Sequence, residues 1–302
     1  MNNINNEKIS ELRDAVENLI SSAQSDKDIR MATFALNDLS KAISTLAPYK
    51  NHKKITIFGS ARLKEDTEEY KATESLAKSL AQAGFTIITG GGPGLMHAGL
   101  QGAGGNGVGI AIELPFETVN HEVEVLNGWP LARQQMFFTR KLALIRNVNG
   151  FIVAPGGFGT LDEFFEVLTL IQTGKSKPAP IVLFETKQSP MWSSLNGFIS
   201  EYLTAKGLVD PSDRILYHIT SDIEDATNYI SKFWSNYTGV HSEGNLVRLN
   251  YKVKPSDSIL ELINSLRSTN GVTEFEEDHL TLEFNLRHWC DLHIIIDAIN
   301  KL

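Results

Sequence analysis

The sequence of this 302-residue chain predicts an α/β fold built on a doubly wound parallel sheet. Between residues 53 and 237, short runs rich in apolar and β-branched residues alternate with longer runs of helical apolar spacing. The short runs are apolar almost throughout, as in strands that are covered on both faces. Glycines gather where these runs end, which is where open α/β sheets bind their ligands. Together these patterns indicate a Rossmann-like core.

The expected strands and helices follow one another in regular alternation. The strands are expected at residues 55–58, 85–89, 108–112, 150–154, 180–184 and 215–219. The clearest helices between them are expected at residues 70–83, 131–148 and 160–172. Since parallel strands are joined by right-handed crossovers, the carboxyl ends of all the strands should lie along one edge of the sheet.

Two flanking segments differ in their residue patterns from this core. The core is expected to span residues 51–238. Residues 1–50 are polar and carry apolar residues at helical spacing, which predicts an N-terminal helical arm of two helices for dimerisation or packing. Residues 239–302 mix alternating patterns, at 246–253 and 280–286, with helical ones, at 258–266 and 293–299. These patterns predict a small C-terminal α+β domain without evident site chemistry.

The composition of the chain limits its function classes. The net charge of −8 argues against a general nucleic-acid binder, which would carry a basic stripe. Cys290 is the only cysteine, so no intramolecular disulfide can form and a cysteine-based zinc site is not expected. The chain starts without a signal-peptide pattern and has no apolar run of bilayer length. We therefore expect a cytoplasmic protein with neither a membrane nor a nucleic acid as partner.

Three glycine-rich loops follow predicted strands, at residues 59–60, 90–96 and 156–160. Each leads into a helix, whose N-terminal N–H groups and dipole suit a phosphate. A single loop of this kind could be only a tight turn, but three on one sheet edge favour anion binding. The dinucleotide and triphosphate fingerprints are both missing, so a mononucleotide with one phosphate fits better. The candidate phosphate-binding residues are Gly59, Ser60, Gly91, Gly92, Gly94, Gly157, Gly159 and Thr160.

Two interpretations of Glu163 are open at the level of sequence. The spacing of Thr160 and Glu163 is that of a capping box with Thr160 at the N-cap, in which Glu163 only satisfies a backbone donor. Alternatively, a carboxylate one turn from the phosphate loop could face the sugar and stabilise an oxocarbenium-like transition state or orient water. Upstream, Arg140 and Lys141 lie between apolar residues, so one of the two should point along a partly buried face and bind phosphate or the leaving base.

These motifs resemble those of the LONELY GUY (LOG) family. Residues 155–163, Pro-Gly-Gly-Phe-Gly-Thr-Leu-Asp-Glu, resemble the family signature Pro-Gly-Gly-x-Gly-Thr-x-x-Glu. The Arg140-Lys141 pair resembles its partner motif, residues 90–96 its second glycine loop, and residues 59–62 its first strand end. The resemblance covers roughly residues 53–235. Relatives were once labelled lysine decarboxylases, but no lysine here lies in an evident pyridoxal-phosphate setting.

The resemblance implies an enzyme that hydrolyses the N-glycosidic bond of a nucleoside 5′-monophosphate to a free base and ribose 5-phosphate. It implies no metal or organic cofactor, and a homodimer or higher homo-oligomer. The catalytic residues implied are Arg140 and Glu163, the phosphate loop is residues 157–160, and Lys141 and Met96 are further candidates.

The identity of the base and two other functions stay open. The stretch from Met136 to Lys141 is similar to the broader bacterial branch of the family, so AMP fits as well as a cytokinin riboside monophosphate. The same pocket could serve a nucleotide sensor that signals through the C-terminal segment. A transferase could pass the ribosyl phosphate to an acceptor other than water. Glu163 favours the hydrolase, because a sensor needs no carboxylate beside C1′.

Overall fold

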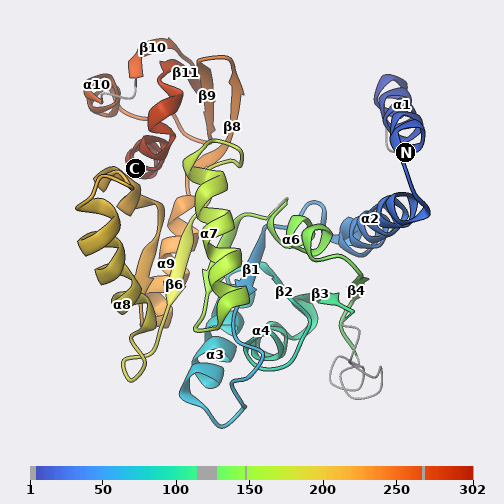
Figure 1. The fold of residues 1–302 in the computed structure, drawn as a ribbon. Coiled ribbons are helices and arrows are strands. Elements are labelled where there is room, and N and C mark those ends of the chain that lie inside the picture. The colour runs from blue at the N-terminus through green and yellow to red at the C-terminus, as the bar shows by residue number, and fades with distance from the viewer. Residues whose placement is uncertain (1–4, 114–127, 147, 267–268, 302) are drawn as a thin grey trace.

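The computed structural model describes residues 5–113, 128–146, 148–266 and 269–301. Its centre is a seven-stranded sheet with the order β4-β3-β2-β1-β5-β6-β7, in which all neighbouring strands are parallel (Figure 1). This confirms the doubly wound α/β fold. The strands are β1 (Lys54–Phe58), β2 (Thr86–Thr89), β3 (Gly107–Ile112), β4 (Leu131–Gln134), β5 (Gly150–Val153), β6 (Ile181–Phe184) and β7 (His218–Thr220).

Helices cover both faces of this sheet. Since alternate strand residues point to opposite sides, each strand contributes apolar side chains to the packing on both faces. Phe58 belongs to the apolar cluster that packs under α6 (Phe137–Ile145) and α7 (Phe158–Gln172). Ile55 and Ile57 belong to the cluster on the other face, under α3 (Glu68–Gln82) and α9 (Ile223–Phe233). The remaining helical segments of the core are α4 (Leu95–Ala103), η2 (Gly104–Asn106), α8 (Met191–Phe198), the π-helical η3 (Ile199–Thr204) and η4 (Pro211–Leu216).

The strand order places a switch point between β1 and β5. From β1 the chain builds the sheet outward to β4, and then returns to add β5 on the other side of β1. In open α/β sheets, ligands bind at the carboxyl ends of the strands beside such a point. The loops after β1 and β5 meet there, where the Ser60 backbone N–H donates to the Pro155 carbonyl oxygen over 3.0 Å.

Two expectations for the core are wrong in part. The helix expected at residues 131–148 begins only at Phe137, because residues 131–134 form the edge strand β4 and pair with β3. This long-range pairing outweighs the local helical pattern. The strand expected at residues 215–219 is β7 at 218–220, because Asp210 accepts a hydrogen bond from the Ser212 N–H and opens the 3₁₀ helix η4 instead.

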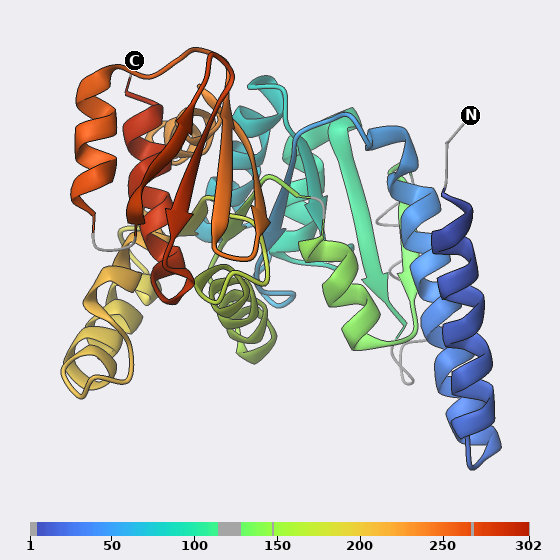
Figure 2. The same cartoon turned by 90° about the horizontal axis from the view of Figure 1, so that it is seen from above.

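The N-terminal segment forms α1 (Asn6–Ser22), α2 (Asp26–Leu46) and the short η1 (Ala47–Tyr49). α2 packs against β4 and α6, whereas no residue of α1 is buried. Figure 1 and Figure 2 show α1 at the outer end of the molecule, away from the central sheet. Across the described ranges, no helix combines the length and the apolar character needed to cross a membrane.

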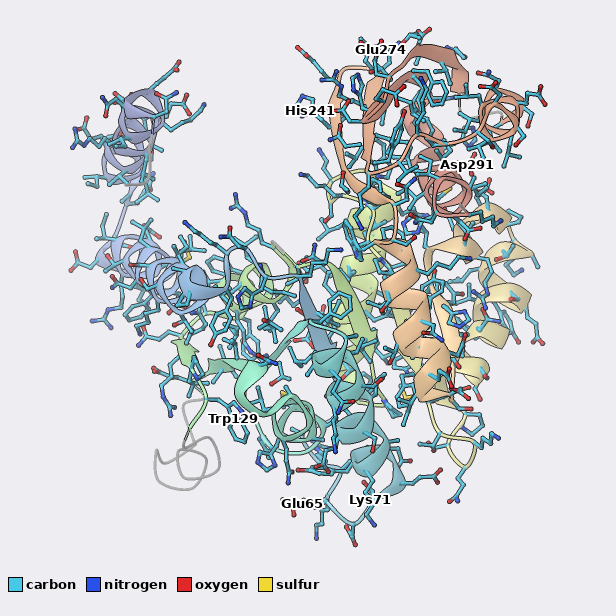
Figure 3. All side chains as sticks on the ribbon, turned by 180° about the vertical axis from the view of Figure 1, so that it is seen from behind. Glu65, Lys71, Trp129, His241, Glu274 and Asp291 are labelled. Atoms are coloured by element: carbon cyan, nitrogen blue, oxygen red, sulfur yellow. The ribbon has the colours of Figure 1, made fainter. Side chains whose placement is uncertain are left out.

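The C-terminal segment forms an antiparallel four-stranded sheet with the order β10-β11-β9-β8. Its elements are β8 (Tyr237–Glu243), β9 (Leu246–Tyr251), α10 (Asp257–Ser265), β10 (Thr269–Phe275), β11 (His279–Phe284), η5 (Leu286–Asp291) and α11 (Leu292–Ile299). The sequence pattern identifies β9, α10, β11 and α11 but misses β8 and β10. In Figure 3 His241 and Glu274 mark this sheet, at the opposite end of the molecule from Trp129 beside α4.

The C-terminal sheet has its own apolar core but also contacts the central one. Val247, Leu282 and Ile295 are buried in the separate core. Cys290 is buried in the main cluster of the central sheet, and an added Cβ at Gly174 would touch the Trp289 ring. The domain boundaries at residues 50 and 238 stay a prediction.

Candidate active site

Arg140 is held at the carboxyl edge of the central sheet by two backbone carbonyls. Its Nε donates to the Ile110 carbonyl oxygen within β3 over 2.9 Å, and its Nη2 donates to the Gly90 carbonyl oxygen after β2 over 3.1 Å. The side chain is only 11% exposed, and its Nη1 lies 3.7 Å from Glu163 Oε1. Of the Arg140-Lys141 pair, Arg140 is therefore the member that enters the site.

Gly90 is needed for this arrangement, although the sequence did not single it out. A Cβ at this position would overlap Arg140 Nη2 and Met96 Sδ. Met96 Sδ also lies 3.9 Å from Arg140 Nη2, so Met96 packs against the guanidinium. The only sequence signal for Gly90 was its place in a glycine-rich run.

Glu163 lies on α7 with 14% of its side chain exposed. Burial raises its pKa to about 7, while the positive charges of Arg140 and Lys141 act in the opposite direction. Burial also lowers the pKa of Arg140, and Glu163 opposes that shift. An arginine nevertheless stays charged. The site thus pairs a fixed cation with a carboxyl that exists in both protonation states near neutral pH.

The capping-box interpretation of Glu163 is wrong. α7 begins at Phe158 with the extended Gly157 as its N-cap, so Thr160 is the third residue of the helix and not its cap. The helix starts this early because the glycine turn lets the backbone pack closely: a Cβ at Gly156 would overlap the Thr160 side chain. Glu163 is therefore buried one turn further into the helix, facing Arg140.

The loops after β1 and β2 pack on each other. The Leu95 N–H donates to the Ser60 carbonyl oxygen over 2.8 Å, and Gly94 has a φ of +66°, with its Cβ position directed into the backbone of the first loop. The Gly91 N–H donates to Thr89 Oγ1 over 3.1 Å, and a Cβ at Gly92 would meet Met96 Cε. A Cβ at Gly59 would touch Leu95.

The loop after β5 is more open than the other two. Nothing lies within 4 Å of the Cβ positions of Gly157 and Gly159. The N-cap residue of α7, Gly157, has no side chain that could accept from the first N–H groups of the helix. No acidic residue lies in the first turn either. Of the three glycine loops, this one leaves room for an anion beside the N-terminus of a helix.

Lys141 does not enter the site. Its Nζ lies 2.6 Å from Asp162 Oδ2 and 2.9 Å from Glu166 Oε2, so it ties α6 to α7 beside the Arg140–Glu163 pair. Within the ranges that the structure describes, no group of three or more His, Cys, Asp or Glu residues could hold a metal ion.

Exposed apolar side chains lie on the two helices that carry Arg140 and Glu163. Phe158, the first residue of α7, is 93% exposed. The others are Phe137, Phe138 and Leu142 on α6 and Phe165 on α7. We call these five residues, four phenylalanines and one leucine, the aromatic rim.

Parts of this chain are similar to known proteins. Residues 93–230 match the family model described as "Possible lysine decarboxylase". A cytokinin riboside 5′-monophosphate phosphoribohydrolase of Rhodococcoides fascians is 29% identical over 184 residues, which are 58% of this chain and 87% of that protein. The relative LOG of Oryza sativa subsp. japonica, which has the same enzyme name, is 29% identical over 156 residues, which are 49% of this chain and 62% of that protein.

Among solved structures, the molybdenum cofactor carrier protein of Chlamydomonas reinhardtii aligns with a TM-score of 0.41 and 20% identity. The alignment covers 60% of this chain and 97% of that one.

The raised pKa of Glu163 predicts a pH dependence of stability. Between the ordinary value of 4.5 and about 7, the native state keeps a proton that the unfolded chain releases, so the free energy of unfolding falls as pH rises. Relative to Glu163→Gln, which cannot ionise, the wild type should lose up to about 3 kcal/mol between about pH 4 and about pH 8. Urea unfolding of both proteins across this range measures it. A constant difference would mean that Glu163 titrates as in water.

Proposed function

We propose that this chain hydrolyses the N-glycosidic bond of a nucleoside 5′-monophosphate, because its motifs resemble those of the LOG family and its curated relatives are named phosphoribohydrolases. The products are a free base and ribose 5-phosphate. The observation that carries the proposal is the buried Glu163, with a pKa of about 7, facing Arg140 Nη1 over 3.7 Å. A carboxyl poised near neutral pH is what general acid–base chemistry at a sugar carbon requires.

The reaction is a displacement at C1′ by water. The bond from C1′ to the base nitrogen breaks, its electron pair leaves with the base, and the ribose acquires oxocarbenium character. The ionised Glu163 stabilises this positive charge and takes a proton from the attacking water. The hydroxide adds to C1′, and the proton passes to the base. The step balances with water as the only co-reactant.

The phosphate of the substrate is assigned to the loop after β5. The first turn of α7 offers backbone N–H groups and a helix dipole, and the open positions at Gly157 and Gly159 leave space for the anion. The loops containing Gly59, Ser60, Gly91, Gly92 and Gly94 support the edge by packing on each other. Arg140 keeps its position through carbonyl contacts and directs Nη1 toward the reacting sugar or the phosphate.

We infer two candidate classes of base from different sources. The curated relatives are named for cytokinin riboside monophosphates. The stretch from Met136 to Lys141, however, is similar to the broader bacterial branch, which makes AMP or another ordinary monophosphate an equally plausible substrate. A panel of both nucleotides in one base-release assay separates them.

We also propose that a second copy of this chain covers the aromatic rim. Phe158 at 93% exposure, Phe137 and Phe138 are exposed apolar residues on two helices that Lys141 ties together. Large apolar patches of this kind mark interaction sites. A homodimer formed here would also shield the adjacent Arg140–Glu163 pair from water.

The phosphate assignment predicts a strong preference for the nucleotide over the nucleoside. If the loop after β5 positions the ribose through its phosphate, AMP should be hydrolysed at least about 10²-fold faster than adenosine, because these contacts reduce the entropy cost of attack. Release of adenine from each compound, followed by chromatography, gives the ratio. Equal rates would exclude the phosphate loop from catalysis.

The catalytic assignment predicts separate effects of two substitutions. Glu163→Gln keeps the size of the side chain but cannot take a proton, so kcat should fall by about 10² or more while nucleotide binding largely survives. Arg140→Ala should weaken binding and turnover together. The matched control, Glu68→Gln, removes an exposed carboxylate from α3 and should behave as wild type. Wild-type turnover by Glu163→Gln would leave a nucleotide sensor as the better account.

The dimer proposal predicts that a charge in the aromatic rim separates the copies. In sedimentation velocity the wild type should run as a dimer and Phe138→Glu as a monomer, since a buried unpaired carboxylate is costly at an interface. Val253→Glu replaces an equally exposed apolar residue outside the rim, and it should remain dimeric. A monomeric wild type would contradict the proposal.

A further inference from the structure

The helix that carries Arg140 begins without a cap of its own. The N-cap residue of α6, Met136, makes no side-chain hydrogen bond, and the first turn contains no acidic residue. The first backbone hydrogen bond of the helix joins the Arg140 N–H to the Met136 carbonyl oxygen over 3.2 Å. The N–H groups before it must find acceptors outside the helix.

For the N–H group of Met136, the N-cap residue, the acceptor comes from the N-terminal arm, about a hundred residues earlier in the chain. Asp38 on α2 is completely buried. Its Oδ2 accepts hydrogen bonds from the backbone N–H groups of Gln135 and Met136, both over 2.9 Å, and from Thr139 Oγ1 over 2.8 Å. Its backbone carbonyl oxygen accepts a fourth, from Gln134 Nε2 over 3.0 Å. One residue of the arm thus holds the turn from the end of β4 into α6.

A carboxylate at this place has a specific physical reason. Burying an ion costs several kcal/mol unless hydrogen bonds and opposite charge compensate. Here two backbone donors, a hydroxyl and the positive end of the α6 dipole provide that compensation. A helix that served only for packing would have an apolar residue at such a position, as α2 does at the buried Ala42.

The geometry points to Asp38 as a positioning residue for Arg140, an inference that rests on the proposed function. Thr139, which donates to Asp38, directly precedes Arg140, and Met136 lies one turn before it. Figure 1 shows α2 lying against α6 at this edge of the sheet. Without Asp38, the first turn of α6 is free to fray. The Arg140 guanidinium then loses its alignment with the Gly90 and Ile110 carbonyls and with Glu163. The arm is thereby part of the catalytic architecture.

The test compares three variants in the full-length chain with AMP as substrate. In Asp38→Ala kcat should fall about 10-fold or more, since small misplacements of catalytic groups have effects of this size. The limb of the pH profile that reports Glu163 should also move to higher pH, because Arg140 lowers the pKa of Glu163. Asp38→Asn keeps one acceptor oxygen and should recover part of the activity. Asp28→Ala should leave kcat and the pH profile unchanged, because Asp28 caps only its own helix, through Gln24 and Ser25.

A second readout does not depend on activity. Hydrogen exchange at the amides of Gln135 and Met136 should accelerate at least about 10-fold in Asp38→Ala and stay at the wild-type rate in Asp28→Ala. If the wild type released no base from any monophosphate, the proposed hydrolase would fail, and exchange alone would decide whether Asp38 holds α6.

The inference would be overturned if the wild type is active and Asp38→Ala folds with unchanged kcat and pH profile. Asp38 would then be only a packing contact between the arm and the core. If Asp38→Ala does not fold, Asp38→Asn is judged by the same criteria.

Discussion

The site depends on how Arg140 is buried. A guanidinium taken out of water needs its donors satisfied, and here the carbonyls of Gly90 and Ile110 accept from two of its nitrogens. Those carbonyls lie near each other because the parallel register pairs Thr89 with Gly109, so that Gly90 and Ile110 are the next residues along the two chains. With Nε and Nη2 fixed, Nη1 has one direction left, and Glu163 lies along it at 3.7 Å. The sheet edge therefore sets the geometry of the pair before any substrate binds.

Close backbone approach is the second constraint, and it explains the glycines better than flexibility does. Gly90 makes room for the guanidinium, and Gly156 makes room for the Thr160 side chain, which lets α7 begin two residues before Thr160. Gly94, with a φ of +66°, lets α4 start against the loop after β1. The loops after β1 and β2 are packed on each other, whereas the Cβ positions of Gly157 and Gly159 face open space. Glycines of similar motifs in this chain therefore have different surroundings, which the sequence alone does not distinguish.

The sequence predicts most of the core because its strands are covered on both faces and read as continuous apolar runs. It also predicts Arg140 and Glu163 as candidate catalytic residues, since their motifs are local, and the structure places these two side chains 3.7 Å apart. It fails where a distant partner decides the local structure. β4 is a strand only because β3 lies beside it, and the N-terminus of α6 is capped by Asp38 from about a hundred positions away. Nothing in the pattern of α2 distinguishes Asp38 from a solvent-facing aspartate. Likewise, Thr160 has the spacing of an N-cap, but the chain turns earlier, at Gly157.

The charge state of Glu163 follows from the groups around it as a set. Arg140 and Lys141 favour its ionised form, while Asp162 and Glu166 favour the protonated one. Lys141 pairs with both of these acids, so the three charges next to Arg140 partly cancel one another at Glu163. What remains is the cost of burial, which exceeds the effect of Arg140 and brings the pKa to about 7. Lys141 therefore influences the protonation of Glu163 without contacting it directly. By engaging Asp162 and Glu166, it keeps α6 and α7 together and leaves the protonation of Glu163 to be decided by desolvation and by the one guanidinium that the sheet edge holds in place.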